Sequence, residues 1–311
     1  MAVLQIVGNT SGAGKTSLAA ALLVTASAAG KQAAYYKPFA DGRGADSDVA
    51  FISGLLESIG GPAVPSPGNK SDSGDLTTAQ AEVSRLESEA GLVVIEGPDG
   101  SAPYALESKV ILVQRHSPGD AIATSIPNLA AIIVNAVPIH RRDEVARELA
   151  GQSVPIAVIP ESRGMLSVTV EQLADHLGGQ WVLDPVNIDA PVERFMIGGN
   201  IMDEGPTYFG RYANQAVITR VERPDIQMAC MSENTKCLVL TGPGEPIEYI
   251  KAEALQREIP LIQVRSNTLD TVESLAGLLD KANARTAAKA SHFAGLLEQY
   301  MGAEAIEQLL S

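Results

Sequence analysis

The chain has few cysteines and few basic residues, and both shortages limit what it can do. Two cysteines in 311 residues, Cys230 and Cys237, cannot build a disulfide framework or a metal site. We expect them to be small apolar residues in a reducing cytoplasm. Lys and Arg number 23 against 37 Asp and Glu, which gives a net charge of −14. Because negative charge repels phosphate backbones, we expect no nucleic-acid partner and no membrane partner.

Long apolar runs are missing as well. No stretch is long and unbroken enough to span a bilayer. The N-terminus reads directly as a strand, so we expect no signal peptide and a cytoplasmic location. The four histidines have no ligand-like spacing, so we expect them on the surface or packed: His116, His140, His176 and His292. The length corresponds to one large domain or two of ordinary size.

In the first half, short apolar segments alternate with helical patterns. The expected strands cover 3–7, 32–36, 92–95, 110–113, 131–134 and 156–159. The expected helices cover 16–29, 48–59, 77–89, 119–126 and 141–149. Strands that are apolar throughout are typical of a parallel sheet buried on both faces. The pattern predicts an α/β fold with a doubly wound, mainly parallel sheet that binds ligands at the carboxyl ends of its strands.

A second, smaller α/β domain is predicted after residue 161. Its expected strands cover 194–197, 216–219, 237–240 and 261–264, and its expected helices cover 225–232, 246–258 and 271–282. The last segment has Phe293, Leu297 and Tyr300 at helical spacing. This spacing predicts an amphipathic helix that docks on its own chain or on a second subunit. We therefore divide the chain into domains at 1–161 and 162–284, with a C-terminal helix at 285–311.

A glycine-rich turn joins the first expected strand to the first expected helix. Its sequence is Gly8-Asn9-Thr10-Ser11-Gly12-Ala13-Gly14-Lys15-Thr16-Ser17. Backbone N–H groups in such a turn bind phosphate oxygens, Lys15 can reach the β- and γ-phosphates, and the Thr16 hydroxyl can hold Mg²⁺. One position departs from the standard spacing, which places a glycine where this chain has Asn9. The alternative, a turn that binds nothing, does not explain the strand before and the Gly-Lys-Thr inside.

Charged residues follow two of the expected strands. Lys37 ends the second strand, where it can contact the γ-phosphate or a bound acid; a solvated strand-end lysine is the alternative. Glu96 follows a buried strand, which is the usual position of an acid that coordinates Mg²⁺. Asp46 and Asp48 precede a helix and offer further oxygen ligands, unless Asp48 only caps that helix.

Two more strand ends lie where a base would bind. Asn135 ends one expected strand, and Pro160 and Glu161 end the next. An Asn side chain can both donate to and accept from adenine, although Asn is also common in turns. We expect these residues beside the bound nucleotide.

These elements together resemble a known group. The Gly8–Ser17 loop, Tyr36-Lys37-Pro38, Glu96-Gly97-Pro98-Asp99-Gly100, Asn135 and Ile159-Pro160-Glu161 are similar to P-loop ATPases of the dethiobiotin synthetase and cobyrinic acid diamide synthase type. That group carries the same expansion of the loop at Asn9. The resemblance implies ATP and Mg²⁺ as cofactors. It implies that Lys15 and Lys37 contact phosphates or substrate, that Thr16, Asp48 and Glu96 handle Mg²⁺, and that Asn135 reads adenine.

The second half resembles the DRTGG domain. The segments 159–170, 192–198, 223–227 and 240–242 carry this resemblance, although the literal Asp-Arg-Thr-Gly-Gly string is absent. In the related family, both domains occur together in the N-terminal regulatory half of long bacterial phosphotransacetylases. Arg163, Arg223 and Asp225 are our candidates for a second ligand site.

The resemblance leaves two main functions open. The first is a nucleotide-binding metabolic regulator, which forms a homo-oligomer and binds a regulatory ligand or partner through its DRTGG-like domain. The second is an ATP-dependent ligase that activates a small carboxylate or carbamate as an acyl phosphate, with Lys15 and Lys37 as catalytic residues. An adaptor protein that keeps the loop without using it is a third reading.

Overall fold

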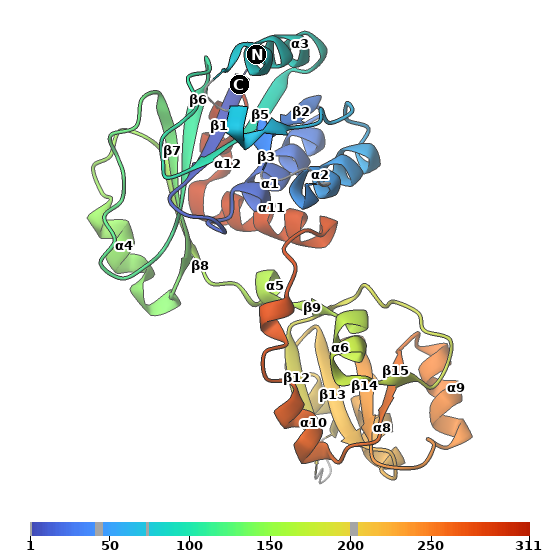
Figure 1. Cartoon of the computed structure of the whole chain (residues 1–311). Coiled ribbons are helices and arrows are strands. Elements are labelled where there is room, and N and C mark those ends of the chain that lie inside the picture. Colours follow the sequence, from blue (N-terminus) through green and yellow to red (C-terminus); the bar gives the residue numbers. More distant parts are fainter. Residues whose placement is uncertain (1, 41–45, 73–74, 200–204) are drawn as a thin grey trace. The chain divides into compact units, whose positions relative to one another are not determined.

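The computed structural model of the chain describes residues 2–40, 46–72, 75–199 and 205–311. It divides into two compact units. Unit 1 comprises Met1–Ser162 and Ala284–Ser311, and unit 2 comprises Arg163–Asn283 (Figure 1). Each unit has its own mainly parallel sheet and its own hydrophobic core.

The sheet of unit 1 has six parallel strands in the order β2-β5-β1-β6-β7-β8. Their bounds are β1 Ala2–Gly8, β2 Ala33–Tyr36, β5 Leu92–Asp99, β6 Lys109–Arg115, β7 Leu129–Val137 and β8 Ile156–Pro160. Two short strands, β3 Phe39–Ala40 and β4 Gly68–Asn69, pair separately. The strand order reverses beside β1, and open α/β sheets bind their ligands at the carboxyl ends of the strands at such a position. The predicted doubly wound, mainly parallel sheet is confirmed.

Helices cover both faces of this sheet. Their bounds are α1 Lys15–Ala28, α2 Ser47–Ser58, α3 Thr77–Glu89, α4 Arg142–Glu148, α11 Ala287–Met301 and α12 Ala303–Leu309, with 3-10 turns η1 Lys70–Asp72 and η2 Ile139–Arg141. Helices α3 and α4 pack on one face through residues such as Val83 and Val145. Helix α1 packs on β1, β2 and β5 and also against α11. Because it is covered from two sides, α1 is apolar around most of its circumference.

The C-terminal segment docks on unit 1 of its own chain. Phe293 and Leu297 are buried where α11 packs against α1 and β8 (Figure 1). The Arg142 guanidinium lies 4.7 Å from the centre of the Tyr300 ring, and Lys31 Nζ donates to the carbonyl of Leu310 at 3.1 Å. This segment is two helices rather than the single predicted one, because Gly302, with a φ of 93°, separates α11 from α12.

One predicted helix of unit 1 is wrong. Residues 119–126 form irregular chain, in which Ile122, Ala123 and Ile126 pack against the core under β6 and β7. Gln114 Nε2 fixes the segment by donating to the carbonyl of Ala121 at 3.1 Å. The apolar spacing that imitated a helix therefore serves a packed loop.

The sheet of unit 2 has five strands in the order β10-β15-β14-β13-β12. The strands are β10 Gln180–Trp181, β12 Arg194–Gly198, β13 Gln215–Arg220, β14 Thr235–Thr241 and β15 Leu261–Val264, and only the edge strand β10 is antiparallel. A separate pair joins β9 Val168–Thr169 to β11 Pro191–Val192. The helical elements are α5 Arg163–Leu166, α6 Val170–Leu177, α7 Gly205–Phe209, α8 Pro224–Cys230, α9 Glu248–Gln256, α10 Thr268–Ser274 and η3 Leu279–Lys281.

Local signals set these elements of unit 2. Helix α6 begins with a capping box, in which Thr169 and Gln172 bond each other's backbone N–H groups. Both cysteines are buried in the core, as expected for small apolar residues. None of the described helices in either unit is long and apolar enough to cross a membrane.

Candidate functional site

The glycine-rich turn of unit 1 lies between β1 and α1 and depends on its glycines. Gly12 and Gly14 have φ values of 74° and 112°, a region that glycine occupies without strain. A Cβ on Gly14 would lie 2.6 Å from Nδ2 of Asn135. Since that distance is too short for any side chain, Gly14 is needed both for its conformation and for its close neighbour.

The departure at Asn9 has a structural role. The Asn9 N–H donates to the carbonyl of Val113 at 3.3 Å, and Asn9 Oδ1 accepts from the N–H of Arg115 at 3.0 Å. These bonds extend the pairing of β1 with β6 beyond Gly8 through a side chain. The expanded loop is therefore attached to the end of β6 before it turns toward α1.

Asn135 holds the other side of the same loop. Its Nδ2 donates to the carbonyl of Ala13 at 3.0 Å, and its Oδ1 accepts from the N–H of Ala136 at 2.9 Å. Ala136 has a φ of 57°, and the register of β7 against β8 shifts at this point. Left-handed non-glycine residues concentrate at functional sites. In this structure the side chain of Asn135 thus positions the loop backbone.

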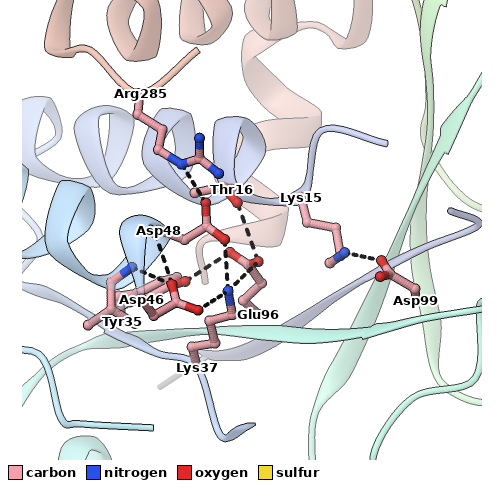
Figure 2. A network of polar contacts seen from close by, with 10 residues as sticks. Lys15, Thr16, Tyr35, Lys37, Asp46, Asp48, Glu96, Asp99 and Arg285 are labelled. Carbon is pink, nitrogen blue, oxygen red and sulfur yellow. Dashed lines mark hydrogen bonds and ion pairs between the residues drawn. The ribbon is translucent and has the colours of Figure 1, made fainter. Parts of the chain in front are cut away.

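Lys37, just after β2, lies among three carboxylates (Figure 2). Its Nζ is 2.7 Å from Asp48 Oδ2, 2.8 Å from Asp46 Oδ2 and 3.7 Å from Glu96 Oε1. Burial would lower the pKa of Lys37, but attraction to Glu96 and hydrogen bonds to Asp46 and Asp48 raise it above its usual value. Lys37 therefore keeps its positive charge at neutral pH.

Glu96 is the most buried of these acids. Tyr35 OH donates to its Oε2 at 2.8 Å, and the Thr16 hydroxyl donates to its Oε1 at 3.3 Å. Burial raises the pKa of Glu96, and the attraction to Lys37 only partly opposes this effect. Burial also raises the pKa of Tyr35, and the charge of Glu96 raises it further. A carboxylate in this environment requires cationic or hydrogen-bonding partners.

Asp46 and Asp48, at the start of α2, have different roles. Asp46 Oδ1 accepts from the N–H groups of Asp48 and Val49, so Asp46 is the N-cap of α2. The carboxylate of Asp48 instead lies between Lys37 and Arg285, whose Nε donates to Oδ1 at 2.7 Å (Figure 2). Burial would raise the pKa of Asp48, but the hydrogen bonds from these two cations lower it. The cap considered for Asp48 is thus supplied by Asp46.

Lys15 forms an ion pair with Asp99 at the end of β5. The Lys15 side chain is mostly buried, whereas that of Asp99 is 42% exposed. An incoming phosphate would compete with Asp99 for this ammonium group. Two residues earlier in β5, Gly97 has no room for a side chain, because its Cβ would lie 2.9 Å from the carbonyl of Ile6. The end of β5 therefore lies directly against β1 and the loop.

The structure brings together most, but not all, of the predicted site residues. Thr16, Lys37, Asp48 and Glu96 form one network of hydrogen bonds and ion pairs (Figure 2). Within the described ranges, no hydrogen bond links the side chains of Asn135, Pro160 or Glu161 to that network. Pro160 and Glu161 end the edge strand β8, where the Glu161 N–H donates to the carbonyl of Val137 at 2.9 Å. The loop residues Gly12, Ala13 and Ser17 line the turn and the start of α1.

Local sequence patterns give no site role to three residues that contact the predicted ones: Tyr35, Asp99 and Arg285. Tyr35 was assigned only to a strand, although its alternation with Tyr36 places the two rings on opposite faces of the sheet. Asp99 belongs to the Glu96-Gly97-Pro98-Asp99-Gly100 segment, but its spacing alone does not indicate its pairing with Lys15. Arg285 contacts a partner 237 residues away in the sequence, so no local pattern indicates it.

The donors at the centre of the network suit a hard divalent cation. Asp48 Oδ2 and Glu96 Oε1 lie 2.7 Å and 3.7 Å from Lys37 Nζ, and Thr16 Oγ1 lies 3.3 Å from the same Glu96 oxygen. These are the oxygen donors that Mg²⁺ prefers. No group of three or more His, Cys, Asp or Glu residues is arranged to hold a metal ion anywhere in the described chain. The set therefore fits Mg²⁺ by its chemistry, with a hydroxyl as one ligand and with Lys37 displaced.

Comparisons with known proteins place this site in a wider context. Two solved structures resemble parts of the chain. The CBS and DRTGG domains of the regulatory region of Clostridium perfringens pyrophosphatase, complexed with the activator diadenosine tetraphosphate, are 14% identical, cover 49% of this chain and 74% of that chain, and give a TM-score of 0.32. A MobB protein homolog from Bacillus stearothermophilus is 20% identical, covers 43% of this chain and 78% of that chain, and gives a TM-score of 0.26.

Two segments of the chain match known protein families. Residues 3–114 match an AAA domain, and residues 172–278 match the DRTGG domain. The first match contains the loop, Lys37, Asp48 and Glu96, and the second contains the sheet of unit 2. The chain therefore combines an N-terminal P-loop domain of the dethiobiotin synthetase-like type with a DRTGG domain.

Proposed function

We propose that this chain is a nucleotide-binding metabolic regulator, in which the P-loop unit binds ATP·Mg²⁺ and the DRTGG unit senses a ligand or partner. The observation that carries the proposal is the charged network of Figure 2, which lies beside the glycine-rich turn. Charged side chains are costly to bury, and a network that serves only stability is often replaceable by apolar residues. Binding of phosphate and a metal ion would explain why charged side chains occupy these poorly exposed positions.

Phosphate binding in this proposal starts with Lys15. Backbone N–H groups of the turn and the N-terminus of α1 attract the phosphates. Lys15 exchanges Asp99 for a phosphate oxygen, and Asn135 keeps the loop backbone in place through the carbonyl of Ala13. A nucleotide thus binds to a turn that is already formed.

The cation and Lys37 complete the proposed site. Thr16, Asp48 and Glu96 would hold Mg²⁺, which neutralises charge on the β- and γ-phosphates when bound. Lys37 then leaves the shared oxygens and faces the terminal phosphate, and Asp46 keeps it close to the site. Tyr35 keeps Glu96 in the orientation that points Oε1 toward Thr16.

The proposed function also has a cellular setting and a position for the adenine base. We propose that the chain is related to the N-terminal regulatory region of phosphotransacetylases, that it acts in the cytoplasm and that it forms a homo-oligomer. Adenine would bind beside Asn135, Pro160 and Glu161, at the ends of β7 and β8. The regulatory ligand of the DRTGG unit is a separate molecule in this scheme.

One observation favours a second function, an ATP-dependent ligase for a small carboxylate. The pKa of Lys37 is raised, since its three carboxylate neighbours outweigh its burial. A permanently charged lysine beside the phosphate loop can neutralise an acyl phosphate as it forms. In that case the substrate carboxylate attacks the γ-phosphorus, and ADP leaves with the electron pair of the broken P–O bond.

Calorimetric titration with ATP and ADP, with and without Mg²⁺, tests the proposal. The variants are Lys15→Ala and, as a matched control, Lys109→Ala, which removes an exposed lysine at the opposite end of the parallel strands. We expect Lys15→Ala to weaken binding about 10- to 100-fold, the equivalent of one charged hydrogen bond. Lys109→Ala should bind like the wild type.

Phosphate release, followed in parallel, separates the functions. Tight binding with negligible release supports the regulator. Release that rises with added small carboxylic or diamino acids supports the ligase. Absence of nucleotide binding in the wild type would overturn both and leave the adaptor reading.

A further inference from the structure

Arg285 lies at a special point of the chain. The backbone leaves unit 2 at Asn283 and enters unit 1 again at Ala284, one residue before Arg285. Thr286 then caps α11, because its side chain accepts from the N–H of Lys289. Arg285 is therefore the first long side chain of the segment that connects the DRTGG unit to the C-terminal helix.

This arginine reaches the metal-ligand candidate Asp48. Its Nε donates to Asp48 Oδ1 at 2.7 Å, while the other carboxylate oxygen, Oδ2, is 2.7 Å from Lys37 Nζ (Figure 2). The Asp48 side chain is mostly buried, and the Arg285 side chain is 42% exposed. The two oxygens of one carboxylate are thus held by cations from opposite ends of the chain.

The division of the two oxygens matters for a metal. Oδ2 and Glu96 Oε1 both lie near Lys37 Nζ, with Thr16 Oγ1 beside that Glu96 oxygen, whereas Oδ1 accepts from Arg285. A cation that replaces Lys37 at that point can take Oδ2 without disturbing the Arg285 bond. Residues that hold a metal-binding carboxylate from behind fix its orientation, and their loss typically weakens metal affinity 10- to 100-fold.

We propose that Arg285 is a positioning residue for Asp48 and that it links the nucleotide site to the segment that joins the two units. This inference rests on the proposed function, since it assigns a regulation to the same site. When Mg²⁺·nucleotide binds through Asp48, it strengthens the Asp48–Arg285 bond and orders residues 284–286. By linkage, any event in the DRTGG unit that moves this segment changes Mg²⁺·nucleotide affinity by the same factor.

Two alternatives for Arg285 make different predictions. If the Arg285–Asp48 contact were an ordinary surface ion pair, its loss would change neither stability nor nucleotide affinity by much, because water screens such pairs. If the bond to Asp48 served the fold alone, its loss would lower the stability of the protein. It would then weaken nucleotide binding equally with and without Mg²⁺. The proposed role affects the Mg²⁺-dependent part of binding alone.

The test uses the full chain and its variants Arg285→Gln and Arg285→Lys. Arg85→Gln is the matched control, because Arg85 is an exposed arginine of unit 1 that is paired with Glu82 and Glu89. ADP affinity is measured at increasing Mg²⁺, and Mn²⁺ replaces Mg²⁺ for electron paramagnetic resonance of the bound ion. We expect Arg285→Gln to weaken Mg²⁺ or Mn²⁺ binding to the ADP complex 10- to 100-fold, with ADP binding in EDTA unchanged. Arg285→Lys should recover part of the loss, and Arg85→Gln should equal the wild type.

Hydrogen exchange supplies a readout on the wild type that needs no variant to fold. We expect ADP·Mg²⁺ to slow exchange at residues 284–288 and ADP in EDTA not to do so. Equal Mg²⁺ dependence in Arg285→Gln and the wild type, or no change in exchange at this segment, would overturn the inference and leave the proposed function intact. A wild type that binds no nucleotide would overturn both.

Discussion

Both units end their parallel strands in polar residues, but the two edges are built differently. In unit 1 the edge carries the buried Glu96 and the half-buried Lys37 and Asp48, whose charges are paired with one another. In unit 2 the edge carries hydroxyls: Thr219 donates to the carbonyl of Gly198 at 2.9 Å, and Thr241 donates to that of Thr219 at 3.3 Å. The first edge holds charges that a ligand can use, whereas the second is a chain of neutral bonds inside the fold.

The charged groups at the strand ends of unit 2 also differ from those of unit 1. Arg223 and Asp225 pair near its strand ends, with 2.9 Å between Nε and Oδ1, and their side chains are 26% and 61% exposed. Exposed pairs contribute little energy, because water screens them. We infer that buried, mutually compensated charge distinguishes a prepared site from a solvated edge.

Replacing Glu96 should have the largest effect. In Glu96→Gln the buried carboxylate becomes neutral, so the oxygen set loses the charge that holds a divalent cation. We expect Mg²⁺-dependent ADP affinity to fall by about 100-fold, at least as much as loss of an outer residue costs. Burial raises the pKa of Glu96, so the free energy of unfolding falls as pH rises through that pKa and the carboxyl group ionises. The variant should therefore be as stable as the wild type at neutral pH or more so.

Isothermal titration and thermal unfolding check this prediction, with the surface variant Glu148→Gln as control. A variant that loses stability and keeps its Mg²⁺ dependence would show that Glu96 belongs to the core and not to a site.

The opposite result is expected in unit 2. Thr241→Val keeps the shape of the side chain but removes a buried hydroxyl that contacts both Thr219 and Thr268, the latter at 2.8 Å. Leaving partners unsatisfied costs about 1–3 kcal/mol. We expect unit 2 to lose that stability and nucleotide affinity to stay unchanged.

The fluorescence of Trp181 reports this loss, because it is the only tryptophan of the chain and packs against the core of unit 2. Thr207→Val, at an exposed position of α7, is the control. A change in nucleotide affinity without a change in stability would contradict the contrast between the two edges.

The contrast also explains what the sequence could predict. Glu96 follows four apolar residues of a buried strand, and Thr16 follows the phosphate-loop lysine, so local patterns indicate both. Asp99, Tyr35 and Arg285 join the site only through tertiary contacts, which no local pattern encodes. The sheet was predictable because each buried strand is apolar along its length. The helix expected at 119–126 was wrong because apolar residues in a packed loop can imitate helical spacing.

A buried charge away from the site should have a smaller effect. Lys289 on α11 is 7% exposed, and burial lowers its pKa to about 8. The unfolded chain therefore binds more protons than the folded one between pH 8 and about 10.4, and the stability of unit 1 should rise with pH in that window. Lys289→Met should lack this rise and should melt about 2–4 °C higher than the wild type at pH 7.

Circular dichroism melting at pH 7 and pH 9.5 checks this prediction, with Lys109→Met as control for the loss of a lysine. Parallel pH profiles of variant and wild type would show that Lys289 keeps an ordinary pKa.

The smallest effect concerns Asp99, whose side chain is more exposed than those of Asp46, Asp48 and Glu96. In Asp99→Asn the neutral amide holds Lys15 more weakly and no longer repels an incoming phosphate. Because partly exposed ion pairs contribute at most about 1 kcal/mol, ADP affinity should rise by no more than about fivefold. Asp143→Asn, which removes an acid paired with Arg142 at 3.1 Å on the surface of unit 1, should leave affinity unchanged. A weaker ADP affinity in Asp99→Asn would contradict this prediction. It would mean that Asp99 stabilises the nucleotide complex, and not only the nucleotide-free protein in which it pairs with Lys15.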